Sequence, residues 1–128
     1  MYFYVQKDKP GKIDPNPVTY DVERLNIGKA MDMKTGVFTA PIDGNYFFTF
    51  SCVSEDGGTL RVQLKVNDKL VGSGVAHELN NSATIQSMLT LVKGDKVTIM
   101  NSLSDEDSEG IRDKPDRLFT HFTGMLLP

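Results

Sequence analysis

Hydrophobic and polar residues alternate along most of this chain, which is the period of a β-strand with one buried face. The clearest run places Tyr46, Phe48, Phe50 and Cys52 on one face, with Phe47 among polar residues on the other. The same spacing recurs in a second run, which consists of Leu60, Val62, Leu64 and Val66. No window keeps the period of a helix, so the chain is predicted to be all-β.

Turn signals divide these runs at intervals of roughly ten residues, a spacing typical of a sandwich or barrel. Asn67-Asp68 and Gly94-Asp95 are predicted to be tight turns, and Ser73 in Gly72-Ser73-Gly74 is also expected in a turn. Between them, a long strand is predicted with Ile85, Leu89 and Leu91 on one face. A last strand is expected from Leu118 to Leu127.

A chain of 128 residues has the length of one domain, here residues 1–128. Its many short strands leave three architectures open: an immunoglobulin-like sandwich, a lipocalin-like barrel and a jelly roll. The Cys-Trp-Cys core of an immunoglobulin domain is excluded, because the chain has no tryptophan and one cysteine. Cys52 lies on the core face and is expected to be a buried, unreactive thiol.

Charge and hydropathy narrow the classes of partner. The formal net charge is -3 and there is no Lys/Arg cluster, which argues against nucleic acid or an anionic membrane surface. No apolar run reaches the length of a membrane span, so membrane insertion is not expected. Residues 1–5 also lack the basic start and long apolar region of a secretory signal.

Catalytic motifs are missing from the sequence. His77 is followed by Glu78 but not by a second histidine at helical spacing, so the zinc-protease motif is absent. Gly72-Ser73-Gly74 does not match the nucleophile elbow of hydrolases. The CxxC spacing of structural zinc is also absent. We therefore expect a protein that is not an enzyme and requires no cofactor.

One acidic segment, from Asp105 to Asp116, imitates a calcium-binding loop. It carries oxygen side chains at alternate positions, Gly110 for a sharp turn and a carboxylate at the twelfth place. Pro115 and the expected flanking strands exclude the helix pair that normally holds such a loop. Two interpretations stay open: a solvated acidic loop, or a calcium site whose ligands are Asp105, Asp107, Glu109 and Asp116.

A longer pattern resembles the signature of the globular domain of the complement C1q family. It runs through Tyr20, Asn26, Met31, Phe38, Gly44, Tyr46, Phe48 and Phe50. Met31 departs from the aromatic or leucine of the signature, and Tyr20 from its usual phenylalanine. Leu91–Val97 is similar to the Gly-Asp hairpin of the family, and Phe122–Leu127 to its closing strand. The resemblance thus covers nearly the whole chain.

This resemblance implies an all-β, antiparallel jelly-roll sandwich of two sheets, as in tumour-necrosis-factor ligands. It also implies a homotrimer that buries the outer face of one sheet. The residues expected at that interface are Phe47, Met88 and His121, together with the aromatic opening strand Tyr2-Phe3-Tyr4. No collagen-like repeat precedes the domain, so the resemblance is to a stalkless form, as in invertebrate C1q-domain proteins, or to an excised head.

Loops on a rigid scaffold carry most binding function, so three loops are the expected ligand contacts. Their candidate residues are Glu55, Asp56, Glu78, Asn80, Asn81 and Arg112. Some family members bind calcium near the trimer apex, where Asn81 here replaces an expected aspartate. Asn80-Asn81-Ser82 is also an acceptor sequence for N-glycosylation if the protein is secreted.

The leading interpretation is a secreted, non-catalytic, trimeric recognition module that binds a glycan or protein on microbial or other extracellular surfaces, as in innate immunity. A cytokine-like ligand for a receptor is one alternative, with affinity for a protein and no response to glycans or calcium. A trimerising structural domain of a matrix protein is another, and loop mutations would then be silent.

Overall fold

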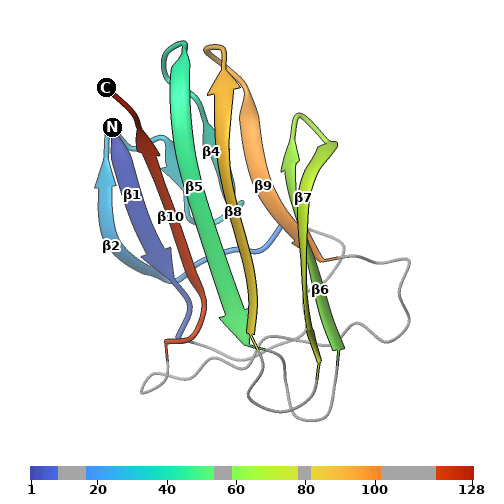
Figure 1. The fold of residues 1–128 in the computed structure, drawn as a ribbon. Coiled ribbons are helices and arrows are strands. Elements are labelled where there is room, and N and C mark those ends of the chain that lie inside the picture. Colours follow the sequence, from blue (N-terminus) through green and yellow to red (C-terminus); the bar gives the residue numbers. More distant parts are fainter. Residues whose placement is uncertain (9–16, 54–58, 78–81, 102–117) are drawn as a thin grey trace.

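The computed structural model describes residues 1–8, 17–53, 59–77, 82–101 and 118–128. Within these residues the chain forms ten β-strands in two antiparallel five-stranded sheets and no helix (Figure 1). None of the described segments is therefore a membrane-spanning helix. The all-β fold predicted from the alternating pattern and the two antiparallel sheets implied by the resemblance are confirmed.

The first sheet has the strand order β2-β1-β10-β5-β8. Its strands are β2 (Val22–Ile27), β1 (Tyr2–Gln6), β10 (His121–Leu126), β5 (Gly44–Val53) and β8 (Ser82–Leu91). Strand β5 pairs with β8 along its whole length, from Gly44 opposite Leu91 to Val53 opposite Ser82. Both chain termini lie at one end of this sheet, near the start of β5 (Figure 1).

The second sheet has the strand order β3-β4-β9-β6-β7. Its strands are β3 (Met31–Asp32), β4 (Val37–Thr39), β9 (Lys96–Asn101), β6 (Thr59–Val66) and β7 (Lys69–His77). The predicted turn at Asn67-Asp68 joins β6 to β7, and both residues have positive φ (50° and 67°). Asn and Asp tolerate this left-handed conformation, which two-residue hairpins favour.

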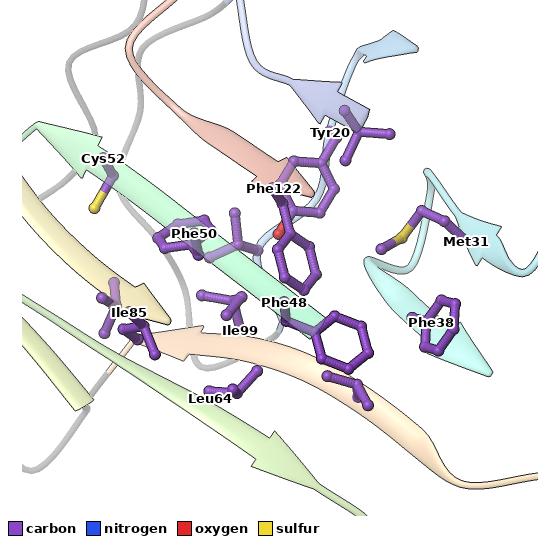
Figure 2. Close-up of a cluster of buried hydrophobic side chains, with 14 of the residues drawn as sticks. Tyr20, Met31, Phe38, Phe48, Phe50, Cys52, Leu64, Ile85, Ile99 and Phe122 are labelled. Atoms are coloured by element: carbon purple, nitrogen blue, oxygen red, sulfur yellow. The ribbon is translucent and has the colours of Figure 1, made fainter. Parts of the chain in front are cut away.

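The core between the sheets is dominated by aromatic rings. Phe38 of the second sheet packs edge-on against Phe48 of the first, with ring centroids 5.3 Å apart, and lies 5.4 Å from Phe3. Phe3 in turn contacts Phe122 at 5.1 Å, also edge-on. Edge-to-face contacts add to the stabilisation from area burial. Figure 2 shows Phe48, Phe50 and Cys52 along β5, facing Leu64 and Ile99 of the other sheet.

The prediction that Phe3 lies at the trimer interface is wrong. Phe3 is 1% exposed and its ring lies in the core against Phe38, Phe48 and Phe122. Gly124, opposite Phe3 on β10, leaves room for this ring, because a Cβ at Gly124 would lie 2.3 Å from it. Phe3 therefore stabilises the fold and does not belong to the outer surface.

Two further expectations differ from the structure. Ser73 lies within β7 and not in a turn. Its neighbours Gly72 and Gly74 face inward, and because they lack side chains, β7 can pack closely against Ile85 of β8. The last strand begins at His121, three residues later than the expected Leu118.

A hydrogen-bonded pair ties two turns together at the end of the sandwich that holds the termini. Asn67 Nδ2 donates to Asp95 Oδ1 at 2.9 Å, and Asp95 Oδ2 accepts from the Val92 backbone N–H at 2.9 Å. The bond from Asn67, followed by the bond from Val92, lowers the pKa of the Asp95 carboxyl. These bonds join the β6–β7 hairpin to the turn between β8 and β9.

Candidate functional site

The outer face of the first sheet carries a row of apolar side chains across all five strands. Cross-strand pairing places them directly opposite one another, in the order Ile27, Tyr2, Met125, Phe47 and Met88. Four of them are strongly exposed: Met88 (70%), Ile27 (49%), Tyr2 (45%) and Met125 (40%). Phe47, between Met125 and Met88, is half-buried. We call these five residues the apolar row.

The face becomes more polar with distance from the chain termini. The next row consists of Leu25, Tyr4, Thr123, Thr49 and Gln86. The row beyond it consists of Val22, Gln6, His121, Ser51 and Thr84. The apolar row can therefore exclude water, while the rows farther from the termini offer hydrogen-bonding groups.

A hydrogen-bonded network lies at the polar end of this face. Tyr4 Oη lies 2.7 Å from His121 Nδ1, and Gln6 Nε2 lies 3.1 Å from the same nitrogen. Arg24 Nε donates to Gln6 Oε1 at 2.7 Å. The Tyr4 and His121 rings also stack, with centroids 5.8 Å apart and planes at 22°. We call Arg24, Gln6, His121 and Tyr4 the polar network.

A β-bulge explains how Arg24 reaches the network. Tyr4 lies opposite Leu25 and the next residue, Val5, lies opposite Glu23, so Arg24 is the additional residue on β2. A bulge bends its strand and redirects a side chain. Here the redirected side chain is that of Arg24, which contacts Gln6.

The structure brings together five of the six predicted interface residues. All but Phe3 lie on this face, and they are Tyr2, Tyr4, Phe47, Met88 and His121. The sequence analysis missed Ile27 and Met125 as members of the apolar row. Met125 could have been found, because it alternates with the inward-facing Phe122 and Gly124.

The predicted loop and metal residues lie outside the described residues. These are the ligand candidates Glu55, Asp56, Glu78, Asn80, Asn81 and Arg112, and the calcium candidates Asp105, Asp107, Glu109 and Asp116. In the part of the chain that the structure describes, no three His, Cys, Asp or Glu side chains gather as a metal site. The ligand and calcium assignments therefore stay predictions.

Tyr20 is a buried residue whose pKa is shifted by its surroundings. Among the described residues its hydroxyl has no hydrogen-bond partner, and its ring packs 5.8 Å from that of Phe122. Burial raises the pKa of the Tyr20 phenol well above its usual value, with a smaller contribution from Cys52. Tyr20 therefore remains neutral and serves the core.

The two sheets form a jelly-roll β-sandwich with one apolar outer face. The model of the C1q domain family matches residues 2–127 of this chain. The chain therefore belongs to the C1q domain family.

Relatives in curated sequences agree with this assignment. Human complement C1q tumor necrosis factor-related protein 3 is 35% identical over 114 residues, which cover 86% of this chain and 44% of the relative. Heavy metal-binding protein HIP of Mytilus edulis is 27% identical over 111 residues, covering 84% of this chain and 50% of the relative. The chain thus spans about half the length of these relatives.

Solved structures show the same fold. The globular domain of zebrafish complement 1qA protein superposes with a TM-score of 0.79 at 25% identity, covering 99% of this chain and 97% of that one. The Eiger tumour necrosis factor of S. frugiperda superposes with a TM-score of 0.74 at 12% identity, covering 100% and 92%. The predicted jelly roll shared with tumour-necrosis-factor ligands is confirmed.

Proposed function

We propose that this protein is a secreted, non-catalytic recognition module that acts as a homotrimer and binds a glycan or protein on an extracellular or microbial surface. The apolar row is the observation that carries the proposal. Membership in the C1q domain family supports a role in ligand binding, and the names of its complement relatives point to action outside the cell.

The apolar row supports assembly because of its size and continuity. Single exposed apolar residues are normal, but a contiguous patch across a whole sheet is typical of an interaction surface. Phe47 has an apolar neighbour on each side, because Met125 and Met88 lie directly opposite it on the two neighbouring strands. Burying this row removes a large apolar area from water, which favours association.

Threefold closure needs two different patches on each subunit, because a rotation of one third of a turn never brings a patch onto itself. The first sheet offers one patch in Tyr2, Phe47 and Met125. Its edge strand β8 offers another in Met88, and the adjacent strand β7 carries the exposed Val71 and Val75. We propose that the edge of one subunit packs on the sheet of the next.

Ligand binding is assigned to the end of the sandwich away from the termini. There β5 ends at Val53 opposite Ser82, and β6 begins at Thr59 opposite His77. The connections that hold Glu55, Asp56, Glu78, Asn80 and Asn81 start from these strand ends. Three weak sites on one rigid trimer gain avidity on a repetitive surface.

Calcium remains a proposed ligand of the segment that holds Asp105, Asp107, Glu109 and Asp116. Bound calcium would stabilise the native state by mass action, and so raise the melting temperature. Replacing Asp105, Asp107 and Glu109 together by Ala is expected to abolish that rise. A rise that persists would place any calcium site elsewhere.

The oligomeric state tests the proposal first. Light scattering coupled to size exclusion should give a mass three times the 14.2 kDa of the chain. Phe47→Asp should yield a folded monomer, since a carboxylate would be buried without a partner. The matched control is Gln63→Asp, which places the same charge on the outer face of the second sheet and should leave the trimer intact.

Binding is the second half of the test. The trimer should bind surfaces coated with bacterial polysaccharide or sialylated glycoprotein more strongly than Phe47→Asp does, because only the trimer has avidity. A monomeric wild-type protein would contradict the assembly. A trimer that binds neither surface but captures a receptor ectodomain would favour the cytokine-like alternative.

A further inference from the structure

A groove crosses the outer face of the second sheet over the short strand β4. Its volume is about 420 Å³, which lies within the range of small-ligand sites. Val37 and Thr39 of β4 line it, with Asp32 of β3 opposite Val37 and Lys96 of β9 opposite Thr39. Since neighbouring strands lie about 4.8 Å apart, the groove spans roughly 10 Å from β3 to β9, enough for a sugar ring with its substituents.

Two lysines from distant parts of the sequence line this groove from opposite sides. Lys29 lies in the turn between β2 and β3, and Lys96 is the first residue of β9. Both side chains are exposed, and within the described residues neither ammonium group has an ion-pair or hydrogen-bond partner. Two unpaired cations on either side of one groove favour an anionic ligand.

Asparagines hold the backbone at both lysines. The backbone carbonyl of Asn26 accepts from Lys29 N–H at 3.2 Å, and the Asn26 side chain donates to the Met31 carbonyl at 2.8 Å. Asn67 Oδ1 accepts from Lys96 N–H at 2.9 Å, and Asn67 N–H donates to the Lys96 carbonyl at 2.8 Å. Lys29 has a φ of 51°, a conformation that is uncommon for lysine and that is found at ligand clamps. Both lysines thus extend from fixed backbone positions, which lowers the entropic cost of binding.

The remaining groups that line the groove favour a sugar over other anions. Thr35 and Thr39 supply hydroxyl groups, and Asp32 supplies a carboxylate. Asp32 Oδ1 accepts from the backbone N–H groups of Lys34 and Thr35, whereas Oδ2 has no partner among the described residues. A chain of carboxylates alone would place negative charge beside Asp32, whereas the hydroxyl groups of a sugar can donate to it.

A second hollow continues the groove along β9. Its volume is about 220 Å³, and it shares Val37 and Lys96 with the first. Thr98 and the turn residue Asp68 also line it, and Lys65 of β6 lies directly opposite Thr98. The two hollows together have room for more than one sugar ring, so the ligand that fits them is a chain.

We propose that these two hollows, which we call the lysine groove, bind an acidic glycan. Its carboxylates pair with Lys29 and Lys96, and its ring hydroxyls contact Asp32 and Thr39. The lysine groove lies within one subunit, on the opposite outer face of the sandwich from the apolar row, so the proposed trimer leaves it open. The site is also separate from the loops to which ligand binding was assigned, so it goes beyond the proposed function.

The test uses isothermal titration calorimetry of the whole chain with four probes of three units each. Trigalacturonic acid and trisialic acid carry carboxylates on sugar rings, maltotriose carries none, and N-acetyl-triglutamate amide carries them on a peptide. At least one acidic sugar should bind with one site per subunit, and maltotriose roughly tenfold more weakly, as expected from the loss of two exposed ion pairs. The tighter of the two acidic sugars distinguishes a uronic acid chain from a sialylated one.

Two variants locate the site. Lys29→Gln and Lys96→Gln should each weaken the acidic sugar roughly threefold, and the double variant roughly tenfold. Added salt should weaken binding to the wild type more than to the double variant, because ions screen exposed charges. Lys93→Gln is the matched control, since it removes the same charge from an exposed turn residue that does not line the groove, and it should bind like the wild type.

Each negative outcome has a separate meaning. Equal affinity for the triglutamate peptide would overturn the assignment to a sugar, and an unchanged affinity in the double variant would overturn the site. Amide chemical shifts that move in the loops but not at Val37 and Thr39 would also overturn it. A monomer that binds through the lysine groove would refute the proposed trimer alone, whereas a trimer that binds neither acidic sugar would refute the lysine groove but not the proposed function.

Discussion

The outer faces of the two sheets differ although both belong to strands with the same alternating pattern. On the first sheet, Phe47 in β5, the strand next to the edge strand β8, has apolar neighbours directly opposite on both sides. On the second sheet, the corresponding strand β6, next to the edge strand β7, presents Gln63, which lies opposite Ser73 and Met100. The exposed apolar residues Leu70, Val71 and Val75 of that sheet are confined to its edge strand β7.

This difference shows what alternation along a strand does and does not determine. Alternation decides which residues face the core, and it does so equally in both sheets. Pairing between strands decides whether the residues on the other face are scattered or aligned. Only in the first sheet does pairing align apolar residues into a row, so only that face has the continuity of an interface.

Among the predicted mutations, the largest effect on stability is expected in the core that both sheets share. Phe48→Ala should lower the free energy of unfolding by about 3–5 kcal/mol, since it removes a fully buried ring. Chemical denaturation measures this loss. Phe47→Ala, at the next position of the same strand, should cost much less in the monomer. A loss below about 1 kcal/mol for Phe48→Ala would mean that the two faces of β5 have been assigned the wrong way round.

Two glycines, one from each sheet, show how much space there is for an added side chain on the inner face of that sheet. In the first sheet, a Cβ at Gly124 would lie 2.3 Å from the buried Phe3 ring. In the second, a Cβ at Gly74 would lie 3.2 Å from Ile85, which can yield by a small shift. Gly124→Ala should therefore cost about 1–3 kcal/mol by overpacking, and Gly74→Ala clearly less. Equal losses in denaturation would contradict this difference.

The sequence was sufficient to predict the all-β fold and the main core residues. Tyr46, Phe48, Phe50 and Cys52 are buried as their spacing predicted, because side-chain direction along one strand is a local property. The membership of the apolar row depends on which strands pair and in what register. Tyr2 and Phe3 are adjacent aromatic residues, and the sequence does not show which of them faces outward. The pairing of β1 with β10 and β2 shows that Tyr2 does.

The polar network was beyond prediction for a similar reason. Arg24, Gln6 and His121 lie far apart in the sequence, and a bulge in β2 is needed to bring Arg24 to Gln6. The sequence analysis placed His121 at the expected interface but gave it no partners. Bulges arise from the fit between strands and leave no clear mark in an alternating pattern.

The smallest expected effect concerns the turns that close both sheets at the end near the termini. Bonds from Asn67 and Val92 lower the pKa of Asp95 in the folded protein, so the folded state holds its proton less tightly than the unfolded chain. The unfolded state then binds more protons, and this contribution to stability is present above the carboxylate range and is lost as the pH falls through it. Asp95→Asn should therefore reduce the loss of melting temperature on acidification by a small amount, because the carboxyl is exposed.

Asp43→Asn is the matched control, since its carboxylate also accepts a backbone N–H, from Lys93, and also lies in an exposed turn. If both variants changed the acid dependence equally, the bridge between Asn67 and Asp95 would have no specific role in joining the two turns.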